Sequence, residues 1–193
     1  FPFNYFETKT ITYKSRDNKD IPIVIIHKKG IELNGNNPTL LRAYGGFGSV
    51  SSPNYDTGLL HFLEKGGVYA FAKVRGGGEK GKNWHKEGKG LKKINSINDF
   101  VDAAEFLIRE KYTNPNKLAI NGGSHGGLVV GAAMTQRPDL FKVVVSEMGR
   151  LDMATLDKYT SVTHHFDEYG NPYNKGEFQS LISYSPYHTI KED

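Results

Sequence analysis

The chain has 193 residues, of which 37% are hydrophobic, so it can form one substantial core but not two ordinary domains. It contains no cysteine, which excludes disulfides, zinc–thiolate sites and thiol nucleophiles. The formal net charge of +4 comes from lysines scattered along the chain, without the clustered basic face that a nucleic acid would need. No apolar run is long enough to span a bilayer, so we expect a soluble protein, cytoplasmic or periplasmic.

The first part of the chain, residues 1–37, predicts a β-hairpin followed by a loop. Residues 10–13 alternate between polar and apolar side chains, and residues 21–26 form a second β-prone run. The polar sequence RDNKD separates the two runs, as expected for the turn of a hairpin.

The second part, residues 38–193, alternates between strand and helix patterns. Its short apolar runs are typical of parallel strands that are buried on both faces. These runs cover residues 39–46, 67–74, 118–120 and 141–149. Helical patterns lie between them, so the order predicts a single α/β domain with a mostly parallel sheet and helices on both faces.

Two helices are predicted with defined ends. A short helix covers residues 57–65 and stops at a glycine pair, and a longer one lies within residues 97–115. Ser96 or Asn98 is the predicted N-cap of the longer helix, and Asn114 with Pro115 forms its predicted stop.

A serine flanked by glycines follows the strand-like run at residues 118–120. The sequence NGGSHGGLVV contains the pattern G-x-S-x-G, centred on Ser124, and an apolar, helix-compatible run comes directly after it. A strand, a sharp turn and a helix are the context in which such a serine is exposed as a nucleophile. Glycines two residues before and after the serine leave room for the neighbouring strand and helix. We therefore predict that Ser124 is a catalytic nucleophile rather than part of a plain connecting turn.

A second glycine motif, GGGEKG at residues 76–81, formally matches the pattern of a dinucleotide-binding turn. The polar, glycine-broken sequence after it is unlike a helix that packs on a sheet, so we predict no nucleotide cofactor. No metal site is predicted either, because the adjacent His164 and His165 lack convincing ligand spacing with the nearby acids.

Several segments, in the same order, resemble the catalytic domain of the prolyl oligopeptidase family of serine peptidases. They are YGGFG (44–48), VRGGGEKGKNWHKEG (74–88), INGGSHGGLVV (120–130), QRPDLF (136–141) and, further on, KYT and YSP. The resemblance covers residues 38–193 and implies an α/β-hydrolase fold. It also implies hydrolysis of peptide bonds in short peptides through an acyl-enzyme on Ser124.

The resemblance further implies roles for residues around this serine. Tyr44 matches a tyrosine whose hydroxyl forms half of the oxyanion hole, and the backbone N–H of His125 would supply the other half. Phe47 matches an aromatic wall of the pocket that receives the residue before the cleaved bond. Tyr169 matches another tyrosine beside that pocket.

Three residues depart from the proline-specific members of the family. His165 stands where they have a tryptophan that stacks on the substrate proline, Arg150 replaces a small apolar pocket residue, and His125 replaces the common asparagine. An arginine would prefer an acidic partner over proline, unless it points away or pairs with an acid such as Glu147. We therefore expect a more polar pocket and an altered proline preference.

The acid and base of a catalytic triad are not apparent. The histidines after Ser124 are His125, His164, His165 and His188, and none has the surroundings of the family's catalytic histidine. The resemblance thus implies a chain that ends before the last strands and lacks the β-propeller, and that depends on the remainder of its own polypeptide for turnover. Two alternatives stay open: an esterase or acylaminoacyl-type hydrolase on the same fold, and a non-catalytic α/β binding module. We expect no nucleic-acid or membrane partner.

Overall fold

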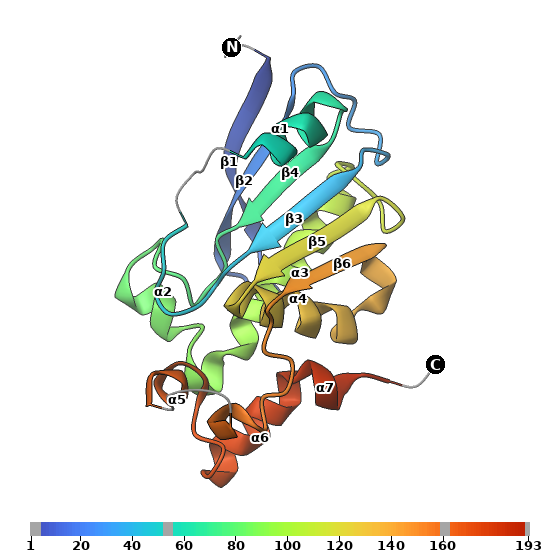
Figure 1. The fold of residues 1–193 in the computed structure, drawn as a ribbon. Coiled ribbons are helices and arrows are strands. Elements are labelled where there is room, and N and C mark those ends of the chain that lie inside the picture. Colours follow the sequence, from blue (N-terminus) through green and yellow to red (C-terminus); the bar gives the residue numbers. More distant parts are fainter. Residues whose placement is uncertain (1–4, 52–55, 159–162, 192–193) are drawn as a thin grey trace.

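The computed structural model describes residues 5–51, 56–158 and 163–191. Within these residues, six strands form one sheet with the order β1-β2-β4-β3-β5-β6 (Figure 1). The strands are β1 (Phe6–Lys14), β2 (Asp20–Lys28), β3 (Thr39–Ala43), β4 (Val68–Ala72), β5 (Leu118–Gly123) and β6 (Val143–Glu147). The β1–β2 and β2–β4 pairs are antiparallel, whereas the other three pairs are parallel. The predicted α/β class with a mostly parallel sheet is confirmed, and the amino-terminal hairpin continues that sheet.

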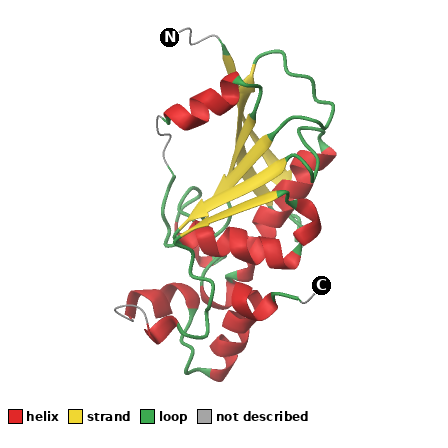
Figure 2. Cartoon of the chain, turned by 45° about the vertical axis from the view of Figure 1, so that its right-hand side comes forward, coloured by secondary structure: helices red, strands yellow, loops and turns green. Residues whose placement is uncertain are grey.

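Helices cover both faces of the sheet, as predicted. On one face α1 (Thr57–Glu64) contacts β2 and β4, and on the other α3 (Ile94–Arg109) and α4 (His125–Gln136) pack side by side (Figures 1 and 2). Alternate residues of a strand face the same side, and the residues of β2 and β4 that face α3 and α4 are almost fully buried. The main core therefore lies between the sheet and these two helices.

The start of α3 differs from the prediction. The helix begins at Ile94, so Ser96 and Asn98 lie in its first turns and do not cap it. Their side chains serve tertiary contacts instead, because the Ser96 hydroxyl donates to the Arg75 carbonyl and the Asn98 amide oxygen accepts from Arg16. Local preference predicts a capping role for Ser96 and Asn98, but in the folded chain both side chains bind residues that are distant in sequence.

The end of α3 also comes earlier than predicted. The helix ends at Arg109, well before Asn114 and Pro115. Lys111 has a φ of 59°, in the left-handed region, and this conformation stops the helical hydrogen bonding.

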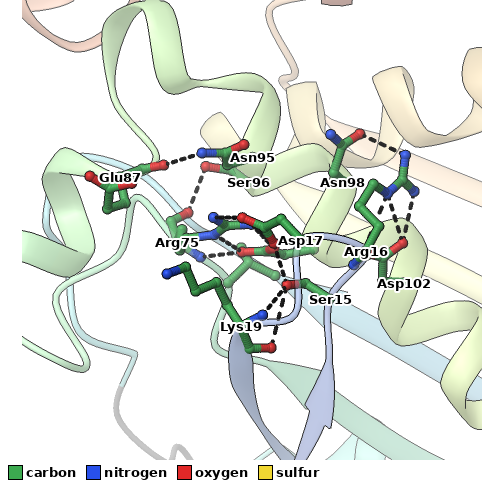
Figure 3. Close-up of polar contacts among 12 residues, drawn as sticks. Ser15, Arg16, Asp17, Lys19, Arg75, Glu87, Asn95, Ser96, Asn98 and Asp102 are labelled. Carbon is green, nitrogen blue, oxygen red and sulfur yellow. Dashed lines mark hydrogen bonds and ion pairs between the residues drawn. The ribbon is translucent and has the colours of Figure 1, made fainter.

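An ion-pair network with a buried Arg75–Asp99 pair at its centre anchors the hairpin turn to α3 (Figure 3). The guanidinium of Arg75, which follows β4, donates to Asp99 of α3 and to Asp17 of the turn, with contacts of 2.6–2.9 Å. Arg16 of the same turn donates to Asp102 of α3 at 2.8 Å. Because Arg75 and Asp99 are both buried, loss of either would leave a buried charge without its partner.

The carboxyl-terminal part of the chain forms helices that the sequence analysis did not predict. They lie beyond the carboxyl ends of the parallel strands (Figure 1). They are α5 (Thr163–Tyr169), α6 (Lys175–Tyr184) and α7 (Pro186–Thr189), preceded by the 3₁₀ turn η3 (Leu156–Lys158). A second apolar cluster, which includes Leu128, Met153, Leu181 and Tyr184, holds this helical part against α3 and α4. The remaining short elements are α2 (Lys82–Lys86), η1 (Gly90–Lys92) and η2 (Pro138–Leu140).

Candidate active site

Ser124 lies at the tip of the turn between β5 and α4. Its backbone, with φ 54° and ψ −116°, occupies a region that residues other than glycine rarely adopt. The Ser124 N–H donates to the Glu147 carbonyl at 2.8 Å, which fastens the turn to the end of β6, while the side chain is exposed. The sharp strand-to-helix turn predicted around Ser124 is therefore present.

The glycines on either side of Ser124 are required by close backbone approach. A Cβ added to Gly122 would lie 2.2 Å from the carbonyl oxygen of Gly126, and one added to Gly126 would lie 2.6 Å from the carbonyl oxygen of Ala43. Gly123 is different, because its added Cβ would meet nothing closer than 3.9 Å. The pattern G-x-S-x-G thus reflects two steric constraints, two residues before and two residues after the serine.

Two hydrogen-bond donors lie beside the serine. The hydroxyl of Tyr44, in the loop after β3, interacts with Ser124, and burial raises the pKa of Tyr44 overall. The N–H of His125 is at the first position of α4 and has no backbone acceptor within the described residues. Free N–H groups at a helix start favour negative charge, so this pair of donors can stabilise an oxyanion.

The imidazole of His125 is buried and its hydrogen bonds identify its protonation state. Nε2 lies 2.8 Å from the Gly45 carbonyl, which can only accept, so Nε2 carries the hydrogen. Nδ1 then accepts from the Tyr169 hydroxyl at 3.2 Å. Burial, reinforced by the charge of Lys93, lowers the pKa of His125 well below its ordinary value. The side chain is therefore neutral and fully engaged, and it is not available as a base for Ser124.

One cavity of about 530 Å³ lies beside the turn and brings the predicted site residues together. All seven residues singled out from the sequence line it: Tyr44, Phe47, Ser124, His125, Arg150, His165 and Tyr169. The lining is completed by Met148, Gly149, Leu151, Asp152 and Thr155. The site thus combines the loop after β3 and the β5–α4 turn with residues 148–155 and with α5.

Aromatic rings form one side of this cavity. The Phe47 ring meets the rings of His165 and Tyr169 edge-on, with centroids 5.8 and 5.7 Å apart. The rings of His165 and Tyr169 are stacked at 6.0 Å. The loop that carries Phe47 sits directly on His125, because a Cβ at Gly46 would lie 2.0 Å from that imidazole. These contacts create a rigid, mainly apolar wall next to Ser124.

A buried ionic cluster supports that wall from behind. Glu168, which precedes Tyr169 in α5, accepts from the Lys93 ammonium at 2.5 Å and lies 2.7 Å from His85 Nε2. Lys93 is completely buried, and burial lowers its pKa even though Glu168 acts in the opposite direction. The Lys93 ammonium also lies 5.4 Å from the Tyr169 ring centroid. The cluster therefore fixes α5, and with it the aromatic wall, to the start of α3.

The described residues hold no general base for Ser124. Within the described part of the chain, no imidazole is hydrogen-bonded to the Ser124 hydroxyl, and the side chain of His164 lies outside that part. His188 instead bonds to Ser185. In the same described residues, no three His, Asp or Glu side chains come together as a metal site. None of the described helices combines the length and apolar character needed to cross a membrane.

Sequence reasoning missed three residues that shape the site. Asp152 and Thr155 line the cavity, and Glu168 holds α5 in place. The sequence offered a weak signal for Asp152, because it lies two residues after Arg150 in the motif GRLDM. No local pattern marks Glu168, since its partners are more than 70 residues away in the chain.

Comparisons with known proteins identify the family. Residues 53–193 match the model described as the prolyl oligopeptidase family. The chain belongs to this family. It is 42% identical over 196 residues to the prolyl endopeptidase of Dictyostelium discoideum, and the alignment takes in 100% of this chain and 26% of that protein.

Solved structures agree with this result. A chain from a study of two prolyl endopeptidases has a TM-score of 0.96 and 44% identity, and the match covers 98% of this chain and 28% of the other. A post-proline cleaving enzyme from Rickettsia typhi gives a TM-score of 0.93 and 37% identity, covering 97% of this chain and 27% of the other. The chain thus spans about a quarter of the length of its prolyl oligopeptidase relatives.

Proposed function

We propose that the cavity beside Ser124 is the substrate site of a serine peptidase that hydrolyses short peptides. The observation that carries the proposal is the exposed Ser124 hydroxyl, held in a strained turn and flanked by two oxyanion donors on the wall of one cavity. The Ser124 oxygen attacks the peptide carbonyl, the C–N bond breaks and the amine leaves with the proton of the serine hydroxyl, so that an acyl-enzyme remains. Water then attacks the ester, which releases the acid and returns a proton to the Ser124 oxygen. The Tyr44 hydroxyl and the His125 N–H receive the oxyanion in both steps.

The residue before the cleaved bond enters the part of the cavity that Phe47, Arg150, His165 and Tyr169 line. Phe47 and Tyr169 contribute the aromatic surface, which resembles that of proline-specific relatives. Arg150 and His165 make the pocket more polar than a proline site, so proline is not its strict preference. The proposed substrates are short peptides, and Arg150 and His165 shift the preference for the residue before the cleaved bond away from proline.

The base and the acid of the triad come from outside the described residues. This part of the proposal rests on the absence of an imidazole at the Ser124 hydroxyl within those residues, together with the full engagement of His125. A serine hydroxyl is a weak nucleophile until a base removes its proton. The last strands of the α/β-hydrolase fold, in the remainder of the polypeptide, are the proposed source of both groups, and that remainder also includes the proposed β-propeller. The lack of a base at Ser124 within the described residues also favours one alternative, a binding module that keeps the sharp turn but does not catalyse hydrolysis.

Acylation of Ser124 followed by intact mass tests the proposal. Imidazole is added as a substitute base, and the acyl donors are a blocked peptide thioester and an aryl acetate. A peptidase site predicts one adduct, formed faster from the peptide than from the acetate and absent from Ser124→Ala. Tyr44→Phe should slow the reaction by about a hundredfold. Faster reaction with the acetate would instead support an esterase, and peptide binding without any adduct would support the binding module.

A further inference from the structure

Arg150 is a positively charged residue on the wall of the cavity. It follows the end of β6, is partly buried, and lines the cavity together with Ser124 and Tyr169. Its charge acts on the Tyr169 hydroxyl, where it opposes the rise in pKa that burial causes. A guanidinium is always charged in proteins. Arg150 therefore brings one full positive charge close to the aromatic wall.

The acidic residue nearest to Arg150 in the cavity lining already has other partners. Asp152 accepts from the Ala154 N–H at 3.0 Å with one oxygen and from the Thr155 hydroxyl at 2.9 Å with the other. Both contacts are local in sequence, and Asp152 Oδ1 also lies 3.8 Å from His188 Nδ1. Within the described residues, Asp152 makes these contacts and no ion pair with Arg150.

Two other acids near the site are also engaged elsewhere. Glu147, which sequence analysis offered as a partner for Arg150, accepts from the Asn121 side-chain amide. Glu168 is held by Lys93 and His85 behind the wall. Within the described residues, no carboxylate forms an ion pair with Arg150. The sequence left open whether Arg150 pairs with an acid such as Glu147, and the structure does not contain that pair within the described residues.

Apart from Asp152, whose carboxylate is engaged within its own turn, the remaining lining residues near Arg150 carry no charge that would oppose a substrate carboxylate. His125 is neutral, with both ring nitrogens engaged, and Phe47, Met148 and Leu151 are apolar. A partly buried guanidinium is stabilised by a carboxylate that can accept two parallel hydrogen bonds from it. A proline ring would bring no acceptor to this charge, and it would remove part of the charge's hydration.

We propose that the pocket selects peptides with glutamate or aspartate before the cleaved bond, and that Arg150 determines this specificity by binding the acidic side chain. The inference deepens the proposed function, since it assumes that the cavity receives a peptide. The carboxylate could also come from the carboxyl terminus of a peptide. These two sources share one chemistry, and blocked and unblocked peptides distinguish them.

Peptide binding to the full chain, measured by titration calorimetry, tests the proposal without requiring turnover. The probes are acetyl-Ala-Glu-amide, acetyl-Ala-Gln-amide and acetyl-Ala-Pro-amide at neutral pH. A fourth probe, acetyl-Ala-Gln with a free carboxyl terminus, reports on terminal recognition. We expect the Glu amide to bind at least about tenfold more tightly than the Gln and Pro amides, because a charge-assisted contact is stronger than a neutral one.

Variants identify the residue responsible. Arg150→Met should abolish the difference between the Glu and Gln amides, and Arg150→Lys should retain part of it, because lysine keeps the charge but not the paired geometry. The control Arg109→Met changes an exposed arginine at the end of α3 and should leave the difference intact. The preference should also decline as the pH falls through about 4, where glutamate takes up a proton.

Several results would overturn the inference. Equal binding of the Glu and Gln amides, tighter binding of the Pro amide, no measurable binding of any probe, or a preference that survives Arg150→Met would each do so. Tight binding confined to the free carboxyl terminus would show terminal recognition instead. Failure of the proposed function looks different, since Ser124 would then resist acylation while the Glu preference persisted.

Discussion

The turn around Ser124 and the wall formed by Phe47, residues 148–155 and residues 165–169 build one cavity by different means. The turn depends on backbone geometry, because Gly122, Ser124 and Gly126 are four residues apart at most and their contacts are mainly with backbone atoms. The wall depends on side chains, namely stacked rings and a buried ionic cluster whose members are far apart in the chain. The turn is therefore a local structure, whereas the wall exists only in the folded chain.

This difference has a functional meaning. The turn fixes where the Ser124 hydroxyl and the His125 N–H lie, and in the proposed mechanism both take part in acyl transfer. The wall determines which residue fits beside them, and its side chains can change without altering the turn. Substitutions in the two regions should therefore give separable effects on folding, on labelling of Ser124 and on peptide preference.

The largest effect is expected from the buried cluster behind the wall. Lys93→Met leaves the buried Glu168 carboxylate without its ammonium partner, and the free energy of unfolding should fall by about 4 kcal/mol. The matched double variant Lys93→Met/Glu168→Gln removes both charges and should recover much of the loss. Urea unfolding measures both variants. A single variant as stable as the parent chain would show that the cluster does not hold α5.

In the turn, Gly122→Ala should lower the free energy of unfolding by about 3 kcal/mol, because the new methyl group meets the Gly126 carbonyl, which cannot move freely. Gly123→Ala is the matched control, since the space at that position is open, and it should cost less than about 1 kcal/mol. Urea unfolding compares the pair. Equal losses would contradict the steric account of the motif.

His125 connects the two regions and should make stability dependent on pH. The folded state keeps this imidazole neutral, whereas the unfolded chain protonates it below about pH 6.5. Since the unfolded state binds more protons there, the free energy of unfolding should fall by about 1 kcal/mol as the pH drops from about 6.5 to 5.5.

The pH series in urea is repeated with His125→Asn and with His61→Asn, which changes an exposed histidine of α1. The dependence over this range should largely disappear in His125→Asn and persist in His61→Asn. The same slope in all three proteins would mean that His125 is not the group responsible.

The smallest effect is expected at the edge of the sheet. Val143 and Val145 of β6 are 49% and 44% exposed, and β6 is the last strand of the described sheet. Val145→Lys should reduce self-association in sedimentation velocity at high protein concentration, because charge on an edge strand opposes strand pairing. Its free energy of unfolding should change by less than about 0.5 kcal/mol. If self-association is unchanged or greater in Val145→Lys, the chains do not associate through the β6 edge.

How much could be predicted from the sequence follows from the same comparison. The turn was predictable because its steric requirements fall on Gly122, Ser124 and Gly126, which lie within five residues of one another in the sequence. The strands were predictable because their apolar runs are short and continuous. The other six predicted cavity residues, such as Phe47 and Tyr169, were reached through the family resemblance, and the structure places them on the same cavity as Ser124.

The sequence did not predict features that depend on distant partners. Ser96 has the chemistry of a helix cap, but the Arg75 carbonyl competes for its hydroxyl. Glu168 has no local signature, because its partners Lys93 and His85 are 75 and 83 residues away in the sequence. The sequence also could not show whether Arg150 pairs with Glu147. In the structure the Glu147 carboxylate accepts a hydrogen bond from the Asn121 side chain instead.

The most direct test of the account is reaction of the chain with a fluorophosphonate, followed by intact mass, with and without added imidazole. The account places a correctly presented Ser124 hydroxyl next to two oxyanion donors but without a base. It predicts a single adduct that forms at an appreciable rate only when imidazole is present and that is lost in Ser124→Ala. Labelling that is equally fast without imidazole, or that persists in Ser124→Ala, would contradict it.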